Sequence, residues 1–154
     1  MAAEKLLGHR KARRVPAQRI HLTLLFVGSV ASEMTDVIAT AAEAVQGTRF
    51  VLQLDTAGYW RRPQVVWLAP SSPPPALMRL AERLREAVGN TGVALETRRF
   101  KPHITLARQV VSAPDRGLTE PLRWHINGFG LYQSVTHASG PDYQLVRHFP
   151  CAEP

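Results

Sequence analysis

Residues 21–24 of the chain are HLTL and residues 103–106 are HITL, so one four-residue pattern occurs twice in 154 residues. Each copy lies in a strand-forming run, IHLTLLFV (20–27) and PHITLA (102–107). Alternate side chains of a strand share a face, so each copy predicts a histidine and a threonine on one face and apolar residues on the other. Two such strands side by side would place two imidazoles and two hydroxyls in one groove.

The four polar side chains of the two tetrads suit the chemistry of phosphate esters. A neutral imidazole can take a proton from an attacking water, while a protonated imidazole can give one to the leaving oxygen. Histidine titrates near neutral pH, so both forms coexist. Threonine hydroxyls can donate hydrogen bonds to phosphate oxygens. One tetrad alone is explained as well by packing, but a pair is expected by chance on the order of once in several thousand sequences of this length.

The hydrophobic pattern around the tetrads predicts an α+β fold with two main helices. Strands are expected at 20–27, 50–55, 64–69, 93–97 and 102–107, and again in the tail around 122–135 and 142–149. One helix is expected after a Ser32 N-cap, up to Val45, and a second after the prolines at 73–75, up to Val88. Each tetrad falls in one rough half of the chain. We therefore expect a bilobal, pseudo-symmetric two-sheet fold with a central cleft and the two helices packed outside.

Length and charge restrict the class of protein. The length argues for a single domain over residues 1–154. The formal net charge of +7 favours polyanionic partners such as RNA, although an arginine-rich genome explains it equally well. Basic residues gather near the start of the chain, at Lys5, Arg10, Lys11, Arg13 and Arg14.

The sequence carries no sign of a membrane or secretory context. No apolar run approaches the roughly 20 residues of a membrane helix, and the start lacks the apolar segment of a secretory signal. Cys151 is the single cysteine, which excludes an intramolecular disulfide. A cytoplasmic protein with no membrane partner is the expectation.

The segments HLTLLFVG (21–28) and FKPHITLAR (100–108) resemble the two signature motifs of the two-histidine (2H) phosphoesterases. The flanking segments RRVPAQRIHLTLLFVG, GYWRRPQVVWLAP and RRFKPHITLAR are most similar to bacterial RNA 2′,3′-cyclic phosphodiesterases, also called 2′–5′ RNA ligases. The resemblance implies a bilobal α+β enzyme that hydrolyses the 2′,3′-cyclic phosphate at an RNA end to a 2′-phosphate, with reversible 2′–5′ ligation. It implies no metal and no cofactor.

The resemblance also implies roles for individual residues. His21 would be the proton donor and His103 the proton acceptor, while Thr23 and Thr105 would hold the phosphate. Arg108 matches the arginine that closes the second motif. Strict strand alternation places Arg108 on the face opposite His103, so Arg108 needs a bulge or the strand's end to reach the site.

Other expectations concern the RNA and the start of the chain. Tyr59, Trp60, Arg61 and Arg62 form an aromatic–basic cluster that could contact RNA through stacking and charge, although a loop that covers the core explains the cluster as well. Phe100 and Lys101 flank the second motif and are further candidates for RNA contacts. Trp67 and Trp124 are expected in the core. The opening strand of the resembled family is absent before His21, which predicts an exposed sheet edge and self-association there.

Two alternatives to a metal-independent enzyme remain open at this stage. One is a non-catalytic module that binds RNA ends with the same groove. The other is a metal site made of His21, His103 and another histidine, which lacks an accompanying carboxylate or cysteine.

Overall fold

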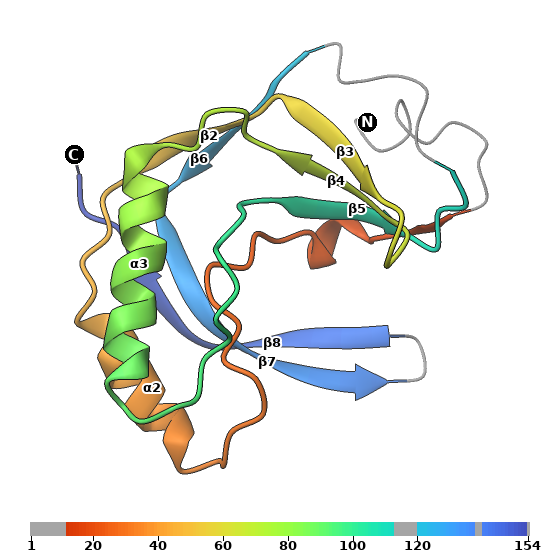
Figure 1. Ribbon diagram of the computed structural model, residues 1–154. Coiled ribbons are helices and arrows are strands. Elements are labelled where there is room, and N and C mark those ends of the chain that lie inside the picture. Colours follow the sequence, from red (N-terminus) through yellow and green to blue (C-terminus); the bar gives the residue numbers. More distant parts are fainter. Residues whose placement is uncertain (1–11, 113–119, 138–139, 154) are drawn as a thin grey trace. The chain divides into compact units, whose positions relative to one another are not determined.

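The computed structural model of the chain describes residues 12–112, 120–137 and 140–153, and it divides into two compact units (Figure 1). The first unit comprises the residues up to Thr23, Leu52–Pro73 and Lys101–Trp124. The second comprises Leu24–Val51, Pro74–Phe100 and the residues from His125 onward. Lys5, Arg10 and Lys11 of the predicted basic cluster lie outside the described residues.

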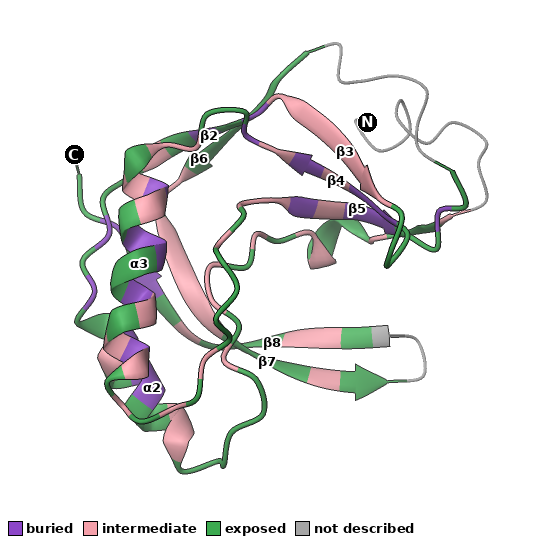
Figure 2. Ribbon diagram, viewed as in Figure 1, coloured by how far each residue is buried: buried purple, intermediate pink, exposed green. Residues whose placement is uncertain are grey.

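The first unit is built on a four-stranded antiparallel sheet. Its strand order is β1 (Arg13–Arg14), β5 (Ile104–Arg108), β4 (Val65–Ala69) and β3 (Thr56–Trp60). Alternation of the strands sends one set of side chains to a buried face, where Val66, Leu68, Ile104 and Leu106 are at most 3% exposed. Figure 2 shows this burial along β4 and β5. A short 3-10 helix, η1 (Ala17–Arg19), leads from β1 to the first tetrad.

The first tetrad does not lie in a regular strand, so the strand predicted at 20–27 is wrong. A single antiparallel bridge pairs Leu22 with Ile104, and no other residue of that run is in a strand. The reason is that β1 already occupies the rest of the β5 edge, and the chain passes into the second unit after Thr23. Phe26, expected on the apolar side of the run, is 61% exposed.

The hydrophobic pattern did not predict strand β3, and its central residue explains why. Gly58 pairs directly with Trp67 on β4, and a Cβ added at Gly58 would lie 2.0 Å from the Trp67 ring. Glycine weakens a strand pattern, but here it makes room for an indole from the neighbouring strand. Trp67 is half-buried rather than fully buried, whereas Trp124 is exposed, so the prediction of Trp124 in the core is wrong.

The second unit contains both α-helices of the described residues, α2 (Met34–Glu43) and α3 (Pro75–Gly89). The predicted apolar stripe of α3 is confirmed, since all its members are buried: Leu77, Leu80, Ala81, Leu84 and Val88. Proline at the first helical position begins α3, as expected. Helix α2 begins at Met34 without a side-chain cap, so the N-cap predicted at Ser32 is wrong; the Ser32 hydroxyl donates instead to Glu33.

A long β-hairpin completes the second unit. It consists of β7 (Gly128–His137) and β8 (Gly140–Pro150), and Phe149 of β8 packs into the core with residues of both helices, including Ala39, Ala42, Leu80 and Leu84. No third strand pairs with this hairpin among the described residues, and Tyr132, Leu145 and Val146 are exposed on it. The predicted self-association at a sheet edge stays a prediction. A separate two-stranded sheet pairs β2 (Phe50–Leu54) with β6 (Leu122–Ile126).

The strand predicted at 93–97 is also wrong, because a side chain rather than a neighbouring strand fixes this segment. The Arg85 guanidinium of α3 donates to the carbonyl oxygens of Glu96 and Arg98. Those two carbonyls therefore have hydrogen-bond partners without a neighbouring β-strand.

The predicted α+β class is confirmed by two helices and several antiparallel sheets. The two tetrads come from different halves of the sequence, and His21 and His103 both belong to the first unit. Among the described residues, no helix has the length and apolar character needed to cross a membrane.

The packing of Trp67 over Gly58 predicts the cost of a methyl group. We expect Gly58→Ala to destabilise the fold by about 1–3 kcal/mol, because the added carbon overlaps the ring of a half-buried tryptophan. Denaturant unfolding measures this. Gly89→Ala is the control: its Cβ would lie 3.7 Å from Leu95, and alanine suits a helix better than glycine, so no loss is expected. Equal stability of the Gly58→Ala variant and the unmodified chain would contradict the packing.

Candidate active site

The bridge between Leu22 and Ile104 brings the two tetrads together on one sheet edge. Leu22 lies directly opposite Ile104 in an antiparallel pair. The bridge thus brings the backbone between His21 and Thr23 next to the backbone between His103 and Thr105. Directly opposed residues of a regular antiparallel pair have Cβ atoms roughly 4.5–5.5 Å apart.

The burial of the two tetrads alternates as the sequence predicted. In the second tetrad Ile104 and Leu106 are buried, whereas His103 and Thr105 are partly accessible. In the first tetrad His21 and Thr23 are exposed and Leu22 is half-buried. The four polar side chains consequently share the accessible face of the pairing, which we call the site face. The register gives this group an approximate two-fold symmetry.

Both imidazoles are oriented by the same local contact. The Nδ1 of His21 lies 2.8 Å from the carbonyl oxygen of Arg19, and the Nδ1 of His103 lies 2.7 Å from that of Lys101. A carbonyl oxygen only accepts hydrogen bonds, so Nδ1 carries the proton in both rings. In the neutral form of each ring Nε2 is then the nitrogen without a proton, and the backbone two residues earlier fixes the tautomer.

A β-bulge decides where Arg108 points. Thr105 pairs with Trp67, but Ala107 pairs with Val66, so β5 contains one extra residue between these pairs. Leu106 and Ala107 are consecutively buried, and Arg108 is exposed. The extra residue shifts the alternation by one and places Arg108 on the site face with Thr105. The bulge that Arg108 requires is therefore present.

An aromatic pair that the sequence did not place at the histidines lies beside His103. The Trp60 ring contacts the His103 ring edge to face, with centroids 4.7 Å apart, and it contacts the Trp67 ring at 5.3 Å. Trp67 Nε1 is buried without a hydrogen-bond partner in the described part of the chain, so packing alone holds that indole. Trp60 and Gly58 alternate along β3 and therefore share a face of the sheet. This alternation could have placed Trp60 beside His103, but only if β3 had been recognised as a strand.

The four candidates for RNA contacts have different surroundings. Tyr59 points to the face opposite Trp60, where its hydroxyl donates to the Val110 carbonyl and its ring packs on Val66 and Ala107. Arg62 is exposed in the turn between β3 and β4, and exposed Lys101 supplies the carbonyl that orients His103. Phe100 is half-buried and belongs to the second unit.

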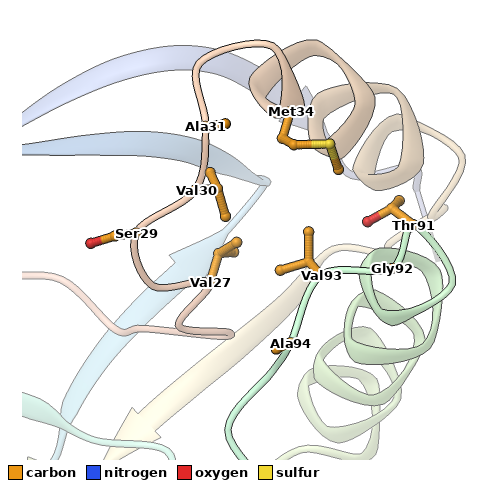
Figure 3. A pocket seen from close by; sticks show the side chains of 9 residues that line it. All are labelled: Val27, Ser29, Val30, Ala31, Met34, Thr91, Gly92, Val93 and Ala94. Carbon is orange, nitrogen blue, oxygen red and sulfur yellow. The ribbon is translucent and has the colours of Figure 1, made fainter.

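The pocket and the cysteine of the second unit add no chemically reactive group to the candidate site. A pocket of about 340 Å³ is lined by small and apolar residues, including Val27, Val30, Met34 and Val93, and none of its lining residues is titratable (Figure 3). Burial raises the pKa of the Cys151 thiol, which opposes a nucleophilic role. No group of three or more histidine, cysteine or carboxylate side chains with metal-site geometry occurs in the described segments.

The Nδ1 contacts predict an observable tautomer. We expect the neutral forms of His21 and His103 to carry the proton on Nδ1, because each donates to a backbone carbonyl. Nitrogen NMR of the imidazole rings, assigned with single histidine variants, distinguishes the two tautomers. The exposed His125 is the control, since no contact of its Nδ1 with a backbone carbonyl is found within the described ranges. An Nε2 proton on either neutral ring would contradict the geometry.

Comparison with known proteins agrees with the resemblance seen in the tetrads. RNA 2′,3′-cyclic phosphodiesterase of Escherichia coli (strain K12) is 38% identical over 125 residues, which cover 79% of this chain and 70% of the relative. The protein of that name from Thermus thermophilus is 33% identical over 159 residues, covering 96% and 80%. The crystal structure of E. coli LigT with 3′-AMP superposes with a TM-score of 0.86 and 31% identity, over 96% of this chain and 85% of that one. A family model described as the 2′-5′ RNA ligase superfamily matches residues 3–138, and the chain belongs to that superfamily.

Proposed function

We propose that the chain hydrolyses the 2′,3′-cyclic phosphate at RNA ends to a 2′-phosphate by paired-histidine acid–base catalysis. The observation that carries the proposal is the bridge between Leu22 and Ile104 inside the two tetrads, together with the contact of each Nδ1 to a backbone carbonyl. The names of the relatives from E. coli and T. thermophilus describe the same reaction.

The reaction requires one proton to be taken and one to be given. A water attacks the phosphorus while the Nε2 of neutral His103 accepts its proton. The bond from phosphorus to the 3′ oxygen breaks, and the Nε2 proton of protonated His21 passes to that oxygen. A 2′-phosphate and a 3′-hydroxyl result. The carbonyls of Arg19 and Lys101 keep both rings aligned through the step.

The remaining residues of the site face bind the phosphate. The hydroxyls of Thr23 and Thr105 donate to its non-bridging oxygens, and the Arg108 guanidinium neutralises charge that develops on them. Trp60 packs against the His103 ring and holds it in place. Since the imidazoles supply both proton transfers, the scheme needs no metal ion. Exposed Lys101 and Arg62 add positive charge for an RNA end.

The same pair of proton transfers would also support ligation of two RNA ends. A 5′-hydroxyl in place of the attacking water would form a 2′–5′ linkage by the same two proton transfers. The name of the superfamily refers to such ligation.

Removal of either imidazole is expected to abolish turnover that a chelator leaves intact. We expect the unmodified chain to hydrolyse an oligonucleotide ending in a 2′,3′-cyclic phosphate in the presence of EDTA. His21→Ala and His103→Ala should each reduce kcat by roughly 10²–10⁴-fold, the usual contribution of one proton transfer. The double variant should lose little more than a single one, because the two groups act as a unit.

Controls distinguish an acid–base enzyme from a binding module and from a metal enzyme. His125→Ala, an exposed histidine on β6, should retain full activity. Tight binding of the RNA end without product would indicate a binding module instead of an enzyme. Activity that disappears with EDTA and returns with zinc would indicate a metal site and refute the scheme.

Two histidines in opposite protonation states predict a bell-shaped pH profile of kcat/KM. Activity should fall at low pH, where the proton acceptor becomes protonated, and at high pH, where the proton donor loses its proton. Initial rates from about pH 5 to about pH 9 measure this. A rate that is constant over the whole range would contradict the acid–base assignment.

A further inference from the structure

Strand β1 places a second arginine next to Arg108. Arg13 lies directly opposite Arg108 in the antiparallel pair of β1 and β5, and both side chains are exposed. Residues directly opposed in an antiparallel pair share a face of the sheet. Because the bulge in β5 turns Arg108 to the site face, Arg13 also points to that face.

A separate contact supports the facing of Arg13. Ala12, its neighbour in the chain, packs against the buried cluster of Val66, Ala107 and Val110 on the opposite side of the sheet. Alternation along the strand then turns Arg13 away from that cluster. Arg14 pairs with the buried Ala107 and so returns to the side of Ala12. The two adjacent arginines therefore point to opposite faces.

The position of Arg13 fits a phosphate next to the reacting one. Arg108 lies roughly 7–10 Å beyond Thr105 along the strand. The long arginine side chain can cover that distance, so its guanidinium can reach the phosphate held by the threonines. Arg13 lies one strand further out, by about 4.8 Å. The Arg13 guanidinium can therefore contact a phosphate other than the one that Arg108 reaches. Arginine is well suited to a phosphodiester because its fork can donate two parallel hydrogen bonds.

We propose that Arg13 binds the phosphodiester on the 5′ side of the terminal ribonucleotide, so that the chain acts on oligonucleotides in preference to mononucleotides. The inference rests on the proposed function, because it places the reacting phosphate at the two tetrads. It names the substrate class as a chain of at least two nucleotides. A cyclic mononucleotide would fill the tetrads and leave the Arg13 position without a phosphate.

The test compares two adjacent arginines on two substrates. Arg13→Gln should lower kcat/KM roughly ten-fold for a dinucleotide ending in a 2′,3′-cyclic phosphate, and leave cytidine 2′,3′-cyclic phosphate nearly unchanged. Arg14→Gln removes the same charge one residue away on the opposite face and should affect neither substrate. The loss should lie in KM, and Arg13→Lys should recover part of it. The salt dependence of the dinucleotide reaction should weaken by about 0.7 in logarithmic slope in Arg13→Gln.

Each contrary outcome has a defined meaning. Equal losses in Arg13→Gln and Arg14→Gln would show general attraction of RNA by charge and would overturn the proposal. An Arg13→Gln loss of the same size on both substrates would also overturn it, because Arg13 would then act at the reacting phosphate or stabilise the fold. The thermal midpoint of the variant distinguishes these two roles, since only a role in the fold lowers it. If the unmodified chain turns over neither substrate, the proposed reaction fails. Titration of a 2′-phosphate-terminated dinucleotide against cytidine 2′-phosphate then tests Arg13 by affinity alone, and equal effects on both would overturn the subsite.

Discussion

The backbone pairing of Leu22 with Ile104 joins the first tetrad to the strand that carries the second. It is one antiparallel bridge, yet it sets which residues of the two tetrads oppose each other. The side-chain period of an extended chain is two, so a slip of one residue would turn His21 and Thr23 toward the buried side. The apolar members protect against that slip: Ile104 is 3% exposed, and a polar residue in its place would be costly to bury.

Much of this arrangement follows from short-range patterns in the sequence. The alternation in HLTL and HITL predicted the facing of the imidazoles and hydroxyls, and the stripe of α3 predicted its buried residues. The same alternation showed that Arg108 needs a bulge, and β5 contains one. These features depend on periods of two and 3.6 residues, which a sequence displays directly.

Features that depend on distant residues were not accessible in this way. Strand β3 is interrupted in sequence by Gly58, whose role is apparent only once Trp67 lies over it. Trp60 was missed as a neighbour of His103 for the same reason. The segment 93–97 has strand-forming residues, but the guanidinium of Arg85 satisfies its backbone. Nothing in the local pattern showed that both tetrads belong to one unit, because the chain leaves that unit and returns to it.

The contacts that orient the two imidazoles come from main-chain atoms, and this affects how the protein can evolve. The carbonyls belong to Arg19 and Lys101, whose own side chains take no part in the contact. Mutation at either position leaves the acceptor unchanged as long as the backbone keeps its course. The orientation of the two rings therefore places no demand on the side chains at these positions, and the Lys101 side chain is left to serve its proposed role toward RNA.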